Sequence, residues 1–177
     1  MTRAGQLRRS LAALAVLSAA GLLGCDAQAN ALSHRPPQPV DFADEIELIA
    51  SPWAENWDGN PGADGVKVRV RLYRVRGTKV ELVTVKGALE FSLYEGVVGS
   101  AGSAARSEVK AFRTWRYAGK ELERFLARGF AGWGYTVPLG WGKPGPATSS
   151  VTVTARYVPP RGRPLPAAPV SISIRAH

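Results

Sequence analysis

The chain has 177 residues, of which 23 are Lys or Arg and 14 are Asp or Glu, so its formal net charge is +9 at pH 7. This length suits one domain with a sizeable hydrophobic core and an additional segment. With one cysteine and two histidines, the sequence offers neither the His/Cys cluster of a zinc site nor the cysteine pair of an internal disulfide.

The first 24 residues have the order of a secretory signal peptide. Arg3, Arg8 and Arg9 form a basic leader, and the uncharged apolar run 11–23 follows it. A positive region, an apolar region and a small residue at the cleavage point are the marks of such a signal. The apolar run is too short to be a membrane span, which needs about 20 apolar residues.

The run ends in Leu22, Leu23, Gly24 and Cys25, which resemble the lipobox of bacterial lipoproteins. In that family the cysteine receives a diacylglyceryl group and becomes the N-terminus after cleavage. The resemblance implies that residues 1–24 are removed and that acylated Cys25 holds the protein on the extracytoplasmic face of a cell membrane, because each buried methylene contributes about 0.8 kcal/mol.

Two alternatives to this anchoring remain open. A cysteine that follows Gly24 by chance would leave an ordinary signal peptide and a freely secreted protein. Asp26 resembles an inner-membrane retention signal of some bacteria, but that rule differs between lineages, so inner and outer membranes both remain open.

Residues 25–43 are predicted to be a flexible tether, because Pro36, Pro37 and Pro39 favour an extended chain without packed structure. Residues 44–177 form the predicted folded domain. The mature chain is still basic, but secretion removes it from the cytoplasm, so we expect no nucleic-acid partner. Envelope glycan, protein or anionic headgroups are the expected partners, unless the charge serves solubility alone.

Alternation of apolar and polar residues predicts strands throughout this domain. The clearest is 66–73, and the others cover 45–49, 80–85, 89–94, 108–117, 135–139, 151–157 and 170–174. Such alternation indicates sheets with one buried and one wet face. We therefore predict a mainly β fold, an antiparallel two-sheet β-sandwich of about seven strands with one short helix. The pattern resembles immunoglobulin-like and transthyretin-like domains, which implies an architecture and no particular function.

The helix is predicted over 119–128. Leu122, Phe125 and Leu126 fall on one side at helical spacing, and Gly129 is placed to adopt the left-handed conformation after the last turn. A helix of about ten residues is not stable alone, so it must pack against a sheet.

The sequence offers few residues suited to catalysis. We therefore expect that the protein is not an enzyme and binds no cofactor. His34 lies in the tether and His177 at the C-terminus, where a base is rarely held within reach of a substrate. A carboxylate-dependent hydrolase remains an alternative if two of the four candidate carboxylates approach each other; these are Glu45, Glu47, Glu90 and Glu95.

Residues 58–65 faintly resemble a calcium loop, with Asp58, Asn60 and Asp64 as candidate metal ligands. Gly62 occupies the third ligand position and no bidentate Glu follows, so an acidic turn is the stronger interpretation.

Four tryptophans, Trp53, Trp57, Trp133 and Trp141, lie in or beside predicted loops. Exposed aromatic rings could stack on sugars, which makes a carbohydrate-binding module an alternative function, although large aromatic residues also fill cores. The expected function is a non-enzymatic envelope binding or assembly module. A cluster of arginines near one strand is predicted to be a solvated sheet face; it comprises Arg69, Arg71, Arg74 and Arg76.

Overall fold

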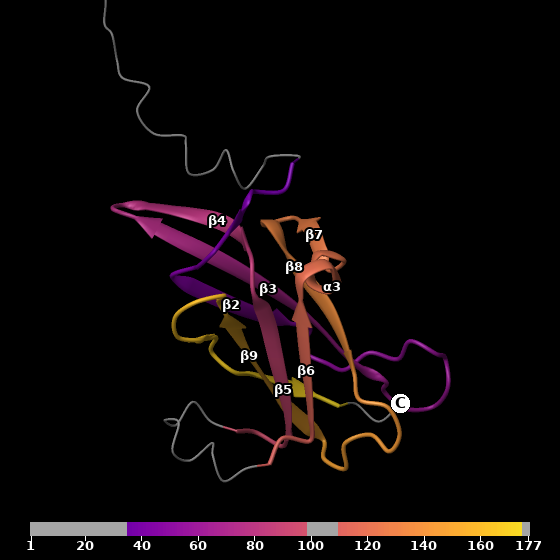
Figure 1. Cartoon of the computed structure of the whole chain (residues 1–177). Coiled ribbons are helices and arrows are strands. Elements are labelled where there is room, and N and C mark those ends of the chain that lie inside the picture. Colours follow the sequence, from indigo (N-terminus) through magenta and orange to yellow (C-terminus); the bar gives the residue numbers. More distant parts are fainter. Residues whose placement is uncertain (1–34, 99–109, 175–177) are drawn as a thin grey trace, which may run out of the picture.

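The computed structural model describes residues 35–98 and 110–174, and the description below concerns these residues alone. They form eleven strands and one short helix, arranged as two sheets that pack face to face (Figure 1). The prediction of a mainly β, two-sheet sandwich is therefore confirmed. The predicted signal peptide, Cys25, His34 and His177 lie outside the described residues.

The first sheet is built around β3 (Gly65–Arg76), a strand of 12 residues. Residues 68–70 of β3 pair with both β2 (Glu45–Ala50) and β8 (Gly132–Gly140), so these two strands lie on opposite edges of β3. The other end of β3 forms a hairpin with β4 (Lys79–Val85), and β7 (Leu126–Gly129) extends the sheet beyond β8.

The second sheet is built around β5 (Ala88–Glu95), which lies between β9 (Ser150–Val158) and β6 (Arg113–Ala118). Two short strands, β10 (Leu165–Pro166) and β11 (Val170–Ser173), share the other edge of β9. The two sheets are also joined along one side, because the segment after β2 runs beside β11 and Ala54 N donates to Ser173 O at 2.9 Å.

The core lies between β3 and β8 of one sheet and β5 and β9 of the other. The inward residues of β3 are at most 1% exposed, as the alternation in 66–73 predicts. Full burial of such a side chain contributes about 1.5 to 3 kcal/mol, so this interface dominates the stability of the fold. Its fully buried residues include Val66, Val68, Val70, Leu72, Leu89, Phe91, Leu93, Val137, Leu139, Val151 and Val153.

The helix prediction is correct at its start and wrong at its end. Helix α3 covers Gly119–Glu123, and the segment that follows it forms β7, which pairs with β8. Gly129 is therefore a strand residue and not a left-handed helix terminus. The pairing with β8 gives the backbone of residues 126–129 hydrogen-bond partners in the sheet, which outweighs a helical tendency that is weak in so short a segment. No helix among the described residues is long and apolar enough to span a membrane.

The predicted tether extends too far toward the domain. β1 (Pro39–Val40) pairs in parallel with the end of β4, and Lys86 N donates to Val40 O at 2.8 Å. Proline lacks the N–H group that a central strand needs, so this short strand occupies an edge of the sheet. The folded part therefore begins well before residue 44, and the sheets contain one parallel pair in addition to the predicted antiparallel ones.

Candidate ligand-binding site

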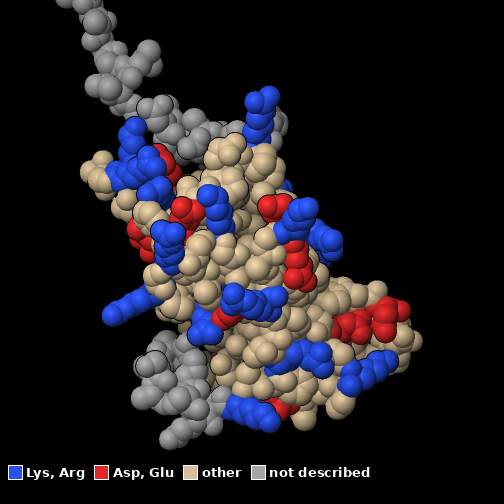
Figure 2. All heavy atoms as spheres, in the orientation of Figure 1, with Lys and Arg blue, Asp and Glu red and all other residues tan. Residues whose placement is uncertain are grey.

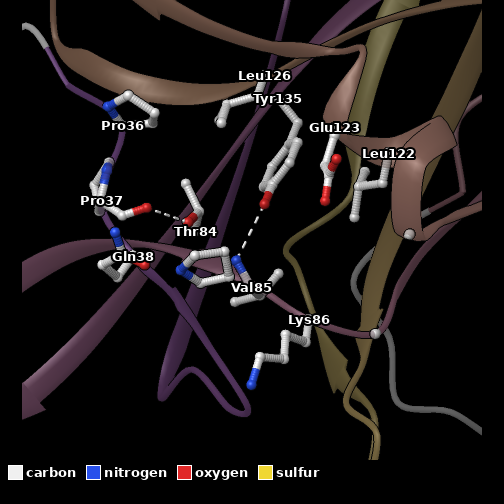
Figure 3. Close-up of a pocket in the computed structure, with 13 residues that line it drawn as sticks. Pro36, Pro37, Gln38, Thr84, Val85, Lys86, Leu122, Glu123, Leu126 and Tyr135 are labelled. Atoms are coloured by element: carbon white, nitrogen blue, oxygen red, sulfur yellow. Dashed lines mark hydrogen bonds between the residues drawn. The ribbon is translucent and has the colours of Figure 1, made fainter.

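A pocket opens at the end of the sandwich where the chain enters the fold (Figure 3). Its volume is about 610 Å³, which lies within the range of roughly 300 to 1,000 Å³ typical of small-molecule sites. It lies between the N-terminal segment, the end of β4 and the α3–β7 region, and its lining is mainly apolar; the lining residues include Pro36, Pro37, Val85, Leu122, Glu123, Leu126 and Tyr135.

One wall of the pocket is the segment 36–39, and specific contacts fix it to the domain. Thr84 Oγ1 donates to Pro37 O at 2.7 Å. A few residues further on, the Tyr157 hydroxyl lies 2.9 Å from Asp41 O and 2.6 Å from Lys86 O. Burial raises the pKa of Tyr157 to about 12, so this hydroxyl keeps its hydrogen and its donor role at neutral pH. These contacts hold residues 36–39 in a fixed position as one wall of the pocket.

The opposite wall comes from α3 and β7. Leu122 of the helix is 2% exposed, and Leu126 of β7 is half-buried beside it. The turn between them is held because Thr136 N donates to Phe125 O at 2.8 Å, and the Phe125 ring meets Tyr117 edge-on, with centroids 4.9 Å apart. The early end of the helix thus allows β7 to place Leu126 at the pocket.

Tyr135 reaches the pocket from β8 and is 3% exposed. Its hydroxyl oxygen accepts a hydrogen bond from Val85 N at 3.1 Å. Burial raises the pKa of Tyr135, the hydrogen bond from Val85 lowers it and the charge of Glu123 raises it, with a net upward shift. Tyr135 is therefore an uncharged hydrogen-bonding group in a mainly apolar cavity, the combination that orients small ligands.

Comparisons of the chain with models of protein families, with curated proteins and with solved structures found no match.

The four predicted aromatic residues do not form one surface. Trp141 is 1% exposed and its Nε1 donates to Ala63 O at 2.8 Å, so its candidacy as an exposed sugar platform is wrong. Trp141 directly follows β8, and its ring turns into the core because the adjoining loop offers a backbone oxygen to the indole N–H. Its position beside a predicted loop did not indicate this burial. Trp133 is half-buried within β8, whereas Trp53 and Trp57 are 46% and 42% exposed.

The candidate metal loop uses its carboxylates to hold its own turn. Asp64 Oδ2 accepts from Trp57 N at 2.6 Å, and Asp58 Oδ1 accepts from Asn60 N at 2.9 Å. Hydrogen bonds from Asn60 lower the pKa of Asp58. Within the described ranges, no three His, Cys, Asp or Glu side chains gather as a metal site. The contacts of Asp58, Asn60 and Asp64 account for the acidic turn without an ion.

Of the four candidate catalytic carboxylates, Glu47 and Glu90 are paired with cations, and these two lie on different sheets. Glu47 of β2 contacts Arg71 and Tyr73, and Glu90 of β5 contacts Arg116 and Arg156. Burial alone raises the pKa of each carboxylate, but the hydrogen bonds outweigh it and the net shift is downward. A general acid needs a raised pKa, so this arrangement does not favour the hydrolase alternative.

Two of the four arginines of β3, Arg69 and Arg71, are bonded within the domain, so their part of the sheet is not the simple solvated face that the sequence predicted. Arg69 Nη2 donates to Gly132 O at 2.6 Å, and Arg71 Nη2 lies 2.7 Å from Glu47 Oε2. They tie the outer surface of β3 to β8 and β2. Over the visible face in Figure 2, basic side chains are spread out with acidic ones among them, so that face is not a single anion-binding patch.

The pocket residues were not among the sequence-predicted site residues. Thr84, Leu122 and Tyr135 lie in unremarkable strand or helix patterns, and the prolines at 36–39 indicate a linker. The one signal that could have suggested a site is Tyr135, a polar-tipped aromatic residue among apolar neighbours of a strand.

Proposed function

We propose that the mature protein is a lipid-anchored, extracytoplasmic and non-enzymatic binding module that holds a small apolar molecule in the pocket between β1, β4, α3 and β8. The observation that carries this proposal is the pocket itself, a mainly apolar cavity of about 610 Å³ with a buried tyrosine hydroxyl at its wall. Cavities of this size and lining are the usual form of small-molecule sites.

The position of the pocket supports the link to the anchor. Residues 36–39, which line it, follow the predicted lipidated Cys25 closely in the sequence. An extended chain spans at most about 3.3 to 3.6 Å per residue, so the segment between them reaches no more than roughly 40 Å. Anchoring at Cys25 would therefore keep the pocket close to a membrane, which is a source of apolar molecules.

Replacing Leu126 by tryptophan should block the pocket. The fluorescent probe N-phenyl-1-naphthylamine, which is apolar and uncharged, is titrated into the protein and its emission is followed. Because the indole would occupy the space between α3 and β1, we expect the affinity for the probe to fall at least about tenfold, a loss of about 1.4 kcal/mol.

Val80→Trp is the matched control for this experiment. Val80 is 47% exposed on the hairpin between β3 and β4 and does not line the pocket, so its replacement adds the same indole without blocking the site. These titrations use the chain with Cys25→Ser, which carries no acyl chain of its own. If the probe does not bind this chain saturably, or if Leu126→Trp and Val80→Trp in the same chain bind it equally, the proposed pocket function is wrong.

Replacing Cys25 by serine tests the anchor. Full-length chains with Cys25 and with serine are produced in a bacterial host, and their intact masses and membrane fractionation are compared. We expect a gain of lipid mass and membrane retention only with the cysteine, because two acyl chains provide stable anchoring and serine offers no thiol for the lipid. Release of both chains in soluble form, cleaved at the same point, would instead make the protein freely secreted.

A further inference from the structure

We infer that the pocket selects an uncharged acyl ester of a membrane lipid, with the Tyr135 hydroxyl donating a hydrogen bond to the ester carbonyl and Glu123 disfavouring a free carboxylate. This inference rests on the proposed function, because it names the ligand class of the same pocket. Three features of the site lead to it: an available donor, a nearby negative charge and an apolar wall.

The donor is the hydroxyl hydrogen of Tyr135. In the hydrogen bond with Val85 N, the tyrosine oxygen is the acceptor, so its own hydrogen remains available. Figure 3 shows this hydroxyl directed between Val85 and Glu123 at the cavity. A donor that is buried without a partner costs free energy, typically about 1 to 3 kcal/mol. A ligand carbonyl oxygen at this point would supply the acceptor.

The charge near the donor favours an uncharged ligand. Glu123 lines the pocket, and its carboxylate lies on the Tyr135 side of the cavity in Figure 3. A ligand carboxylate that accepted from Tyr135 would lie close to this negative charge, whereas an ester carbonyl would not be repelled. The cation of the pocket, Lys86, is paired with Asp41 at 3.0 Å, and its ammonium points away from Tyr135.

The rest of the lining suits a hydrocarbon chain. Leu122, Leu126, Val85 and the prolines of the N-terminal segment present carbon atoms to the cavity. An acyl chain gains about 0.8 kcal/mol for each methylene that leaves water, so the apolar part supplies affinity while Tyr135 and Glu123 supply selectivity. The proximity to the predicted anchor makes a membrane lipid the source to which we commit.

The experiment uses the full chain with Cys25→Ser, so that the protein carries no acyl chain of its own. Bound N-phenyl-1-naphthylamine is displaced at neutral pH by 1-monodecanoylglycerol or by decanoate, which share an acyl chain and differ in charge. We expect the ester to bind about tenfold more tightly than the anion, a difference of about 1.4 kcal/mol.

Two substitutions test whether Tyr135 and Glu123 cause the preference for the ester over the carboxylate. Tyr135→Phe should weaken ester binding about fivefold to twentyfold, in line with the loss of one hydrogen bond. It should leave binding of the fluorescent probe unchanged, because the probe has no carbonyl. Glu123→Gln should raise the affinity for decanoate several-fold, whereas Glu121→Gln, on the same helix but outside the pocket lining, should leave it unchanged.

The outcomes separate this inference from the proposed function. If the probe binds and both acyl ligands displace it equally in the Cys25→Ser chain, with and without Tyr135→Phe, the ligand assignment is wrong and the pocket function stands. If neither probe nor acyl ligand binds, the proposed function fails. If the ester binds only weakly to the Cys25→Ser chain while the lipidated chain excludes the probe, the protein's own acyl chain is the occupant and the membrane source is wrong.

Discussion

Replacing Trp141 by alanine is expected to lower the free energy of unfolding by about 3 to 5 kcal/mol, the range for truncating a large buried aromatic residue. Trp141 is 1% exposed, so the substitution leaves a cavity in the core. It also removes the indole donor from Ala63 O, 2.8 Å away. Urea unfolding followed by circular dichroism measures the loss, which is a large part of the total stability of about 5 to 15 kcal/mol usual for a domain.

Trp53→Ala is the control, because the same type of side chain is removed from a position that is 46% exposed. We expect a loss of less than about 1.5 kcal/mol there. Trp141→Phe keeps most of the ring volume and isolates the hydrogen bond to Ala63, at a cost of about 1 to 2 kcal/mol. Equal losses for Trp141→Ala and Trp53→Ala would contradict the buried position of Trp141.

Replacing Gly87 by alanine is expected to cost about 2 to 5 kcal/mol, since it combines backbone strain with overpacking. Gly87 has a φ of +105°, a conformation that other residues rarely adopt. A Cβ there would lie 2.4 Å from Val158 O, a backbone atom that cannot move away alone. The glycine lies where the chain crosses from β4 to β5, so the strain would act on both sheets.

Gly77→Ala separates these two causes. Gly77, in the turn between β3 and β4, has a φ of +61°, but no atom lies within 4 Å of an added Cβ. Its replacement should cost only about 1 to 2 kcal/mol, the value for one left-handed residue. Thermal and urea unfolding of both variants give the comparison, and a Gly87→Ala chain as stable as Gly77→Ala would show that the close approach to β9 carries no energetic weight.

We expect Gly87→Ala to weaken ligand binding as well as stability, because Gly87 lines the pocket together with Val85 and Lys86. Lys86, the next residue back along the chain, donates from its backbone N to Val40 O at 2.8 Å, and its carbonyl lies beside the Tyr157 hydroxyl that contacts Asp41 O. A shift of this crossover would therefore loosen the wall at residues 36–39, and the fluorescent probe should bind more weakly to Gly87→Ala than to Gly77→Ala at a temperature where both are folded.

The sheets could be predicted from the sequence because their signal is local. In residues 66–73, every second side chain is apolar, and those side chains are the ones that the sandwich buries. The helix was predicted too long because Leu122 and Leu126 have helical spacing, while the pairing of Leu126 with Tyr135 depends on a strand that follows later in the chain. The tether was predicted too long because prolines at 36–39 indicate an extended chain, and extended chain is also what an edge strand requires.

Local patterns of the sequence by themselves determined the β class, the two-faced strands and the start of the short helix, since each depends on neighbouring residues. The signal peptide and lipidated Cys25 are further predictions from local patterns. The pocket was decided only by the tertiary structure, because its lining comes from the N-terminal segment, β4, α3, β7 and β8, which are far apart in the chain. No periodic pattern in the sequence indicates that these distant segments lie side by side. It depends on strand pairing and on the close packing of two sheets, which also bury Trp141 and leave Trp53 exposed.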